Sequence, residues 1–181
     1  AECFSATEMA EARYTAADCI AVGFAIRELK RANFTAGDLR EALVPVTELA
    51  DVGYTAAELA EGGFSATELH DAKFSAVDLR RLRVFKPAEL RAAGFSAAQM
   101  HEARFELRAL REAGFPAREV MALSGPNWFG GPTTRSMLEA GFAASDLGVP
   151  TTELKDAGAS IADWREGGFS LGEIAEAFSL D

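Results

Sequence analysis

The stretch GGFSATELHDAKFSAVDL, residues 62–79, repeats one pattern at an interval of ten residues. Ser65 suits the N-cap of a helix because its hydroxyl can accept the backbone N–H of Glu68, whose carboxylate can accept the N–H of Ser65. Phe64 precedes this cap and Leu69 lies at the fourth helical position, where two apolar side chains meet across a helix start. Each ten-residue unit therefore predicts the start of its own helix.

A stop signal comes just before the next aromatic residue. A residue with positive φ ends a helix there, and glycine adopts that conformation at low cost. The predicted glycines are Gly53, Gly63, Gly94, Gly114, Gly141 and Gly168. Asn33 tolerates the same conformation. Arg13, Lys73 and Arg104 occupy this position at a higher steric cost, so the units that they end are expected to be less regular.

The pattern continues along nearly the whole chain with small departures. Pro45, Pro116 and Pro150 replace the cap residue in three units, which is acceptable because a helix start leaves backbone N–H groups unpaired. Phe85 lies eleven residues after Phe74. One inserted residue is therefore predicted near Val84.

A helix of about two turns is marginal alone, since isolated helices need roughly 12–15 residues. We therefore predict an all-α fold, an α-solenoid of very short helices with one helix per ten-residue repeat and one loop interruption. A continuous coiled coil is disfavoured because a period of ten is neither seven nor eleven. Disorder is disfavoured because 49% of the residues are hydrophobic.

We expect one continuous solenoid in three segments: regular repeats over residues 1–120, a loop insertion over 121–138 and less regular repeats over 139–181. The middle segment contains Gly-Pro, Asn-Trp-Phe and Gly-Gly-Pro, which are loop signals. Trp128 and Phe129 have two interpretations. They either fold back to fill a discontinuity in the solenoid or anchor a partner protein, since tryptophan is enriched at interface hot spots.

The charge of the chain limits its partners. Asp and Glu number 28 against 18 Lys and Arg, a formal net charge of −10, which disfavours nucleic acid and anionic membranes. Capping explains acids such as Glu68 and Asp78. A basic middle segment is the exception, and it includes Arg80, Arg81, Arg83, Lys86, Arg91, Arg104, Arg108 and Arg111. It is either a solvated face or a docking strip for an acidic protein surface.

No motif predicts catalysis, a cofactor or a metal site, so we expect a protein that is not an enzyme. His70 and His101 lie three units apart and are interpreted as surface histidines. Cys19 takes a leucine position and has no CxxC partner, which is typical of a small core residue. Trp164 is similarly interpreted as an enlarged core residue.

The units "FSATEL", "YTAAEL" and "FSAAQM" resemble the AGFSAxELxx decapeptide arrays in predicted proteins of single-celled algae and other microbes. The resemblance covers nearly the whole chain apart from the loop. It implies a repeat architecture and a host with plastids, and the absence of an initial methionine fits the removal of an organelle-targeting segment. It implies no site residues.

These observations predict a soluble, non-catalytic scaffold or linker subunit that binds other proteins within a larger assembly. The candidate partner-binding residues are Trp128, Phe129, Arg80, Arg81, Arg83, Lys86 and Arg91. Specificity is expected at the exposed pairs after each core leucine, which include Lys30 with Arg31, Arg40 with Glu41, and His70 with Asp71. Two alternatives remain: a one-base-per-repeat nucleic-acid reader that uses the basic segment, and a regulatory fragment of an enzyme.

Overall fold

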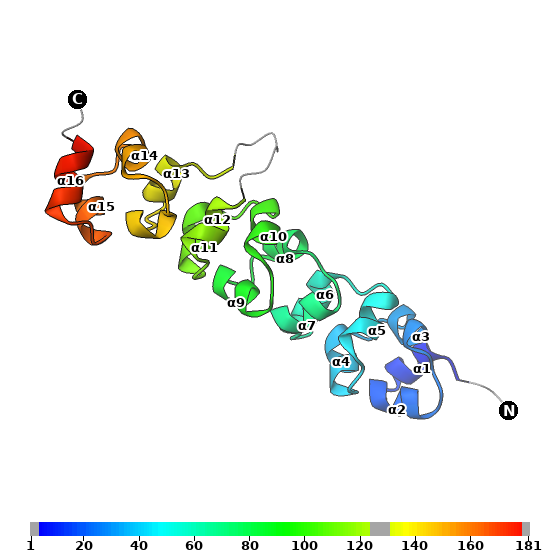
Figure 1. The fold of residues 1–181 in the computed structure, drawn as a ribbon. Helices are drawn as coiled ribbons and strands as arrows, with labels where there is room; N and C mark the ends of the chain where they lie inside the picture. The colour runs from blue at the N-terminus through cyan, green and yellow to red at the C-terminus, as the bar shows by residue number, and fades with distance from the viewer. Residues whose placement is uncertain (1–3, 124–130, 179–181) are drawn as a thin grey trace. The chain divides into compact units, whose positions relative to one another are not determined.

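The computed structural model describes residues 4–123 and 131–178, which form short helices with no strand among them (Figure 1). The helices of the first half are α1 Ala6–Glu11, α2 Ala16–Ala21, α3 Ile26–Arg31, α4 Ala36–Glu41, α5 Val46–Asp51, α6 Ala56–Glu61, α7 Ala66–Asp71 and α8 Ala76–Leu82. Those of the second half are α9 Pro87–Ala92, α10 Ala97–Glu102, α11 Leu107–Glu112, α12 Ala117–Met121, α13 Thr134–Glu139, the 3₁₀ helix η1 Ala144–Leu147, α14 Thr151–Asp156, α15 Ile161–Glu166 and α16 Leu171–Phe178. The predicted all-α repeat of one short helix per ten residues is confirmed.

The helix starts follow the predicted capping chemistry. The Ser65 N–H donates to Glu68 Oε2 at 2.7 Å, and the Glu68 N–H donates to Ser65 Oγ at 3.3 Å. Equivalent reciprocal pairs begin helices at Ser5, Thr15, Thr35, Thr55, Ser75, Ser96, Thr133 and Ser160. Each start therefore depends on residues three positions apart in sequence.

The helix ends are equally local. The Gly63 N–H donates to the Ala60 carbonyl and the Phe64 N–H donates to the Leu59 carbonyl, both at 3.0 Å, with Gly63 at φ +84°. These two bonds satisfy carbonyls that a helix end would otherwise leave unpaired. All six predicted glycines and Asn33 have positive φ.

One expectation about these ends is wrong. Arg13, Lys73 and Arg104 adopt φ of 63°, 67° and 62°, and the helices before them are as regular as those that glycine ends. The same two backbone bonds form at Lys73, from its own N–H to the His70 carbonyl and from the next N–H to Leu69. These bonds and the burial of the core offset the roughly 1–2 kcal/mol that a left-handed residue costs.

The described chain divides into two compact units, Ala1–Phe85 and Lys86–Asp181. Their boundary falls beside the predicted insertion: α8 has seven residues, Arg83 ends it at φ +58°, and Val84 is exposed. The predicted loop over 121–138 is too long at both ends. Met121 belongs to α12, and Thr133 caps α13 through Ser136, a start signal that the surrounding Gly-Pro sequence obscured.

Within each unit, a helix packs mainly against the second helix after it. In the first unit α2, α4, α6 and α8 contact one another in succession, and α1 contacts α3 as α5 contacts α7 (Figure 1). In the second unit α9 contacts α11, α10 contacts α12, and α14 contacts α16. The chain therefore alternates between two rows of helices, and each helix covers the apolar side of its row neighbours.

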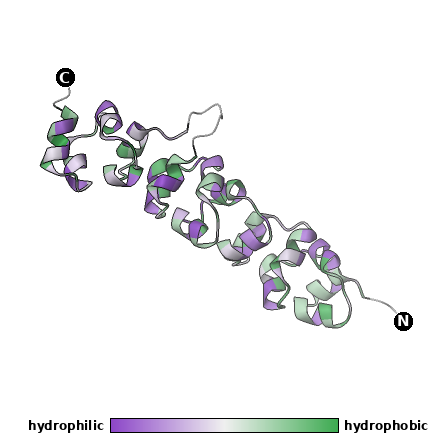
Figure 2. Ribbon diagram, in the orientation of Figure 1, coloured by the Kyte–Doolittle hydropathy of each residue, from purple (hydrophilic) through white to green (hydrophobic). Residues whose placement is uncertain are grey.

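The core is built from one residue per helix. Apart from Ala97, the side chains that are completely buried in α2 to α15 are Cys19, Leu29, Leu39, Leu49, Leu59, Leu69, Leu79, Leu90, Met100, Leu110, Val120, Met137, Leu154 and Trp164. Small alanines such as Ala66 and Ala97, each at the first helical position, are also buried. Figure 2 shows the resulting mixture of hydrophobic and hydrophilic residues on each short helix.

Candidate interaction surface

The residue that directly follows the fully buried core residue of a helix is called the cover position here. It carries a cation in several helices, and the cation reaches the aromatic ring that follows the second helix after its own. Lys30 Nζ lies 4.5 Å from the centre of the Tyr54 ring, Arg40 Cζ lies 5.3 Å from that of Phe64, and Arg91 Cζ lies 5.2 Å from that of Phe115. The repeat therefore uses cation–π contacts to connect neighbours within a row.

Backbone carbonyls reinforce these contacts. Arg91 Nη1 donates to the Ala113 carbonyl at 3.1 Å, and Arg111 Nη1 donates to the Ala140 carbonyl at 3.4 Å. Both carbonyls lie at a helix C-terminus, where the partial negative charge of the helix favours a cation. Arg91 thus binds the end of α11 and the face of Phe115 together.

The two residues of each pair that was predicted to carry specificity, such as Arg40 with Glu41, therefore have different surroundings. Lys30, Arg40 and Arg91 contact their own chain. Arg91 is also exposed, and its role in partner binding stays a prediction. Sequence reasoning missed the internal role because a charged residue beside a core leucine looks like a surface residue. The constant sequence spacing between each of these cations and its aromatic residue was the signal that could have revealed this internal role.

The two histidines also occupy cover positions. His70 and His101 are partly buried, which differs from the prediction of ordinary surface histidines. His70 Nδ1 lies 3.8 Å from Asp71 Oδ1. His101 Nδ1 is buried and has no hydrogen-bond partner among the described residues.

The next residue, the second after the fully buried core residue, is called the end position. It is exposed in every α-helix from α2 to α15. Its occupants are Ala21, Arg31, Glu41, Asp51, Glu61, Asp71, Arg81, Ala92, Glu102, Glu112, Ala122, Glu139, Asp156 and Glu166. The repeat therefore presents one outward-facing side chain per helix, of variable identity and mostly acidic.

Most acids at the end position oppose helix stability. A carboxylate at the last turn faces the negative end of the helix, at a cost of about 0.3–1 kcal/mol. Capping explains acids at the helix start, such as Glu58, whose pKa is lowered by the Thr55 backbone N–H and hydroxyl and by nearby Lys30. Capping does not explain Glu41 or Glu61.

The other residues predicted to bind a partner are distributed between the units. Arg80, Arg81 and Arg83 are exposed on α8 and at its end in the first unit, and Lys86 caps α9 in the second. Trp128 and Phe129 lie outside the described residues. Partner binding by these residues stays a prediction.

Two predicted core residues are confirmed, and both lie away from the surface. Cys19 is fully buried with a free thiol, whose pKa is raised by burial and by Asp18. Trp164 is also fully buried and packs edge-on against Phe169, with ring centres 5.0 Å apart. Neither residue is available to a partner.

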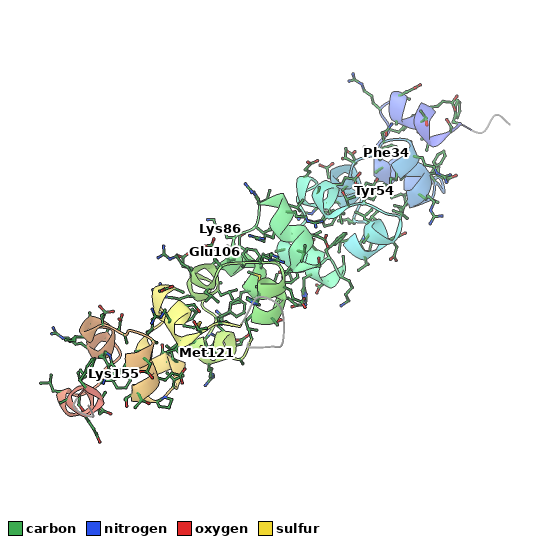
Figure 3. All side chains as sticks on the ribbon, turned by 90° about the horizontal axis from the view of Figure 1, so that it is seen from above. Phe34, Tyr54, Lys86, Glu106, Met121 and Lys155 are labelled. Atoms are coloured by element: carbon green, nitrogen blue, oxygen red, sulfur yellow. The ribbon has the colours of Figure 1, made fainter. Side chains whose placement is uncertain are left out.

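Tyr54 connects the surface to the core. Its hydroxyl donates to the Phe34 carbonyl at 2.6 Å, and Figure 3 shows the two residues together in the first unit. Lys30 lies over the ring, and a shallow groove lined by Asn33, Glu58 and Glu61 opens beside it. Burial and the nearby Glu58 and Asp38 raise the pKa of Tyr54 to about 12.

Two further features concern the described residues only. No three His, Cys, Asp or Glu side chains over 4–123 and 131–178 are arranged to hold a metal ion. None of the helices there combines the length and the apolar character that crossing a membrane demands.

Comparison with known proteins identifies a matching family model. Residues 2–66 and 44–117 both match the family model described as a decapeptide repeat region. No curated protein and no solved structure matches the chain.

Proposed function

This chain belongs to the decapeptide repeat family, and we propose that it acts as a non-catalytic scaffold or linker subunit that binds other proteins in a larger assembly. The observation that carries the proposal is the end position, which is exposed in every α-helix from α2 to α15 and differs in identity between them. A repeat array offers an extended binding surface where equivalent positions recur.

The physical cost of the end-position acids supports this assignment. Glu41 and Glu61 lie at the C-termini of α4 and α6, which contact each other within one row. A sequence selected for stability alone favours Lys or Arg there. Arg31 shows that this chain can place a cation at the same position. Contact with the basic surface of a partner protein explains why acids are retained.

The cover position also supports the proposal, because its cations make contacts inside the chain and leave the end position to face a partner. Its cations contact helix ends and rings of their own chain, so they hold neighbouring repeats together. Adjacent residues of the scaffold then have different roles: Arg40 stabilises the array and Glu41 faces the partner.

The test is affinity capture from the native source with the intact chain as bait, followed by mass spectrometry. A variant with Glu41→Gln, Glu61→Gln and Asp71→Asn removes three end-position charges without changing size. A matched control, Thr7→Ser, Thr47→Ser and Thr67→Ser, alters exposed positions on the first turns of α1, α5 and α7. Loss of defined proteins in the first variant only is the expected result.

Two outcomes would replace the proposal. Equal recovery by both variants would remove the end-position acids from partner binding and return attention to Arg80, Arg83, Trp128 and Phe129. Recovery of RNA or DNA that falls steeply with salt would favour the nucleic-acid alternative, because phosphate contacts are salt-dependent.

A further inference from the structure

The end of α8 at Arg83 is held by fewer hydrogen bonds than comparable helix ends. Basic residues with positive φ also end helices at Arg13, Lys73 and Arg104. At each of those three, the N–H of the following aromatic residue donates to the carbonyl five residues before it, at 3.0 Å. The Arg83 N–H donates to the Arg80 carbonyl at 3.2 Å. The second bond is missing, because the Val84 N–H has no hydrogen-bond partner among the described residues.

The residue inserted at Val84 accounts for this difference. At the other three basic ends an aromatic residue comes directly after the left-handed residue, whereas Val84 separates Arg83 from Phe85. Val84 is 62% exposed. Within the part of the chain that the structure describes, the Phe85 N–H has no hydrogen-bond partner either. Two consecutive backbone N–H groups are therefore left without the bonds that close the other repeats.

The chain is held again immediately after this stretch. The Lys86 N–H donates to Glu89 Oε2 at 2.8 Å, and Pro87 begins α9. The backbone before Arg83 belongs to α8. Residues 83–85 are thus a short stretch between two helices that opens at little cost, and such exposed stretches are preferred sites of proteolytic cleavage.

The residues of this stretch suit a protease that cuts after arginine. Such a protease binds the side chain before the cut bond in a pocket that contains a carboxylate. Arg83 is exposed and is followed by a bond that lies outside any helix, and the exposed Arg81 offers a second cation two residues earlier. The Lys86–Pro87 bond is a poor substrate, because proline has no N–H and a fixed φ.

The position of this bond in the fold spares both cores. The first compact unit ends at Phe85. Its last fully buried residue is Leu79, and the first fully buried residue of the second unit is Leu90. Cleavage after Arg83 therefore leaves the fully buried residues of each unit together on one fragment.

We propose that the Arg83–Val84 bond is a proteolytic processing site for a protease that recognises arginine. The reaction is hydrolysis. Water adds across the peptide bond, the bond from the Arg83 carbonyl carbon to the Val84 nitrogen breaks, Arg83 gains a carboxylate and Val84 gains a free ammonium group. The proposal does not depend on the scaffold function, since cleavage does not need the end-position acids.

The first test is limited digestion of the 181-residue chain with trypsin, with the fragments identified by intact mass. The first pair of fragments should be residues 1–83 and 84–181. Cleavage after Arg83 should be at least about tenfold faster than cleavage after Arg13, Lys73 or Arg104, because those ends must break a further hydrogen bond to open. An earlier cut at any of these three would overturn the proposal.

Two variants separate the conformation of the stretch from its sequence. Deletion of Val84 keeps Arg83 and restores the ten-residue spacing between Phe74 and Phe85, so it should lower the rate after Arg83 to that after Lys73. Arg83→Gln should abolish the cut at this bond. Lys73→Gln is the matched control and should leave the first cut unchanged. Circular dichroism and thermal unfolding check that each variant is folded.

The second test asks whether the site is used in the native source. Free amines of the protein are labelled before digestion with a protease that cuts after acidic residues, and mass spectrometry then identifies labelled peptides. A labelled peptide that begins at Val84 is the expected result. Its absence, or a deletion variant that trypsin cuts after Arg83 as fast as the unmodified chain, would overturn the proposal.

Discussion

The Tyr54 hydroxyl donates a 2.6 Å hydrogen bond to the backbone carbonyl of Phe34, 20 residues earlier. Both side chains are buried. The bond connects the end of one helix to the end of another in the same row, so it holds together two repeats that are not adjacent in sequence.

Tyr54→Phe removes this bond and leaves the Phe34 carbonyl unpaired. Such a loss costs about 1–3 kcal/mol of unfolding free energy. The pKa of Tyr54 is raised to about 12 from 10, so its stabilising effect is complete below pH 10 and disappears as the pH rises through 12. Urea unfolding at pH 8 and pH 11.5 should show the unmodified chain losing stability that the variant does not lose. Parallel pH profiles for both chains would contradict this.

Ser65→Ala removes two of the three hydrogen bonds between Ser65 and Glu68 that start α7, and leaves the one from the Ser65 backbone N–H. The Glu68 N–H loses its acceptor, which typically costs about 1 kcal/mol. Thermal or urea unfolding measures the change. Ser65→Thr is the control, because Thr55 caps α6 in the same way, and it should be nearly neutral. Equal effects of the two substitutions would mean that the hydroxyl does not cap this helix.

Low pH should weaken the capping interactions at the starts of several helices at once. The backbone N–H and the hydroxyl of the cap residue lower the pKa of Glu8 and Glu58 below the ordinary value of 4.5. A lowered pKa in the folded state means that the stabilisation is present above pH 4.5 and is lost as the pH falls through the folded pKa. Glu58→Gln, which retains an acceptor oxygen, should reduce this loss. Circular dichroism at pH 7 and pH 3 tests it.

Gly37 and Gly62 lie close to each other, and substitution by alanine should change the stability of the chain in opposite directions at the two positions. A Cβ on Gly62 would lie 2.7 Å from the Gly37 nitrogen, whereas a Cβ on Gly37 would have no neighbour nearer than 3.5 Å. Gly62→Ala should therefore destabilise the contact between α4 and α6 by about 1–3 kcal/mol. Gly37→Ala lies inside α4 and should stabilise the chain by up to roughly 1 kcal/mol.

The Gly62 result is informative because other units have alanine at the same position, as at Ala42 and Ala72. Urea unfolding of both single variants gives the signs. A neutral Gly62→Ala would show that the helices separate without cost, and the close approach would then not define the row.

The sequence predicted what depends on neighbouring residues. Ser65 with Glu68 and Gly63 before Phe64 act within a few positions, so the helix bounds followed from them. The choice of row neighbour did not follow, because it depends on the direction in which each bend sends the next helix. The covering roles of Arg40 and Arg91 depend on that choice, so in the sequence they appear only as a recurring spacing between a cation and a later aromatic residue. The expectation that Lys73 ends a less regular helix failed for a related reason. The steric cost of its positive φ can be read from the residue itself, whereas the packing that offsets this cost depends on distant residues.

Reversing charge at the end position tests whether its acids serve stability. Glu41→Lys places a cation at the C-terminus of α4, where Arg31 already stands at the end of α3. The change should stabilise the chain by about 0.3–1 kcal/mol at low salt, and Arg31→Glu should destabilise it by a similar amount. Urea unfolding at low salt and at 0.5 M salt measures both, with smaller effects expected at high salt because screening weakens exposed charges. If Glu41→Lys instead destabilised the chain, its carboxylate would have a structural role, and the inference that end-position acids are retained for a partner would fail.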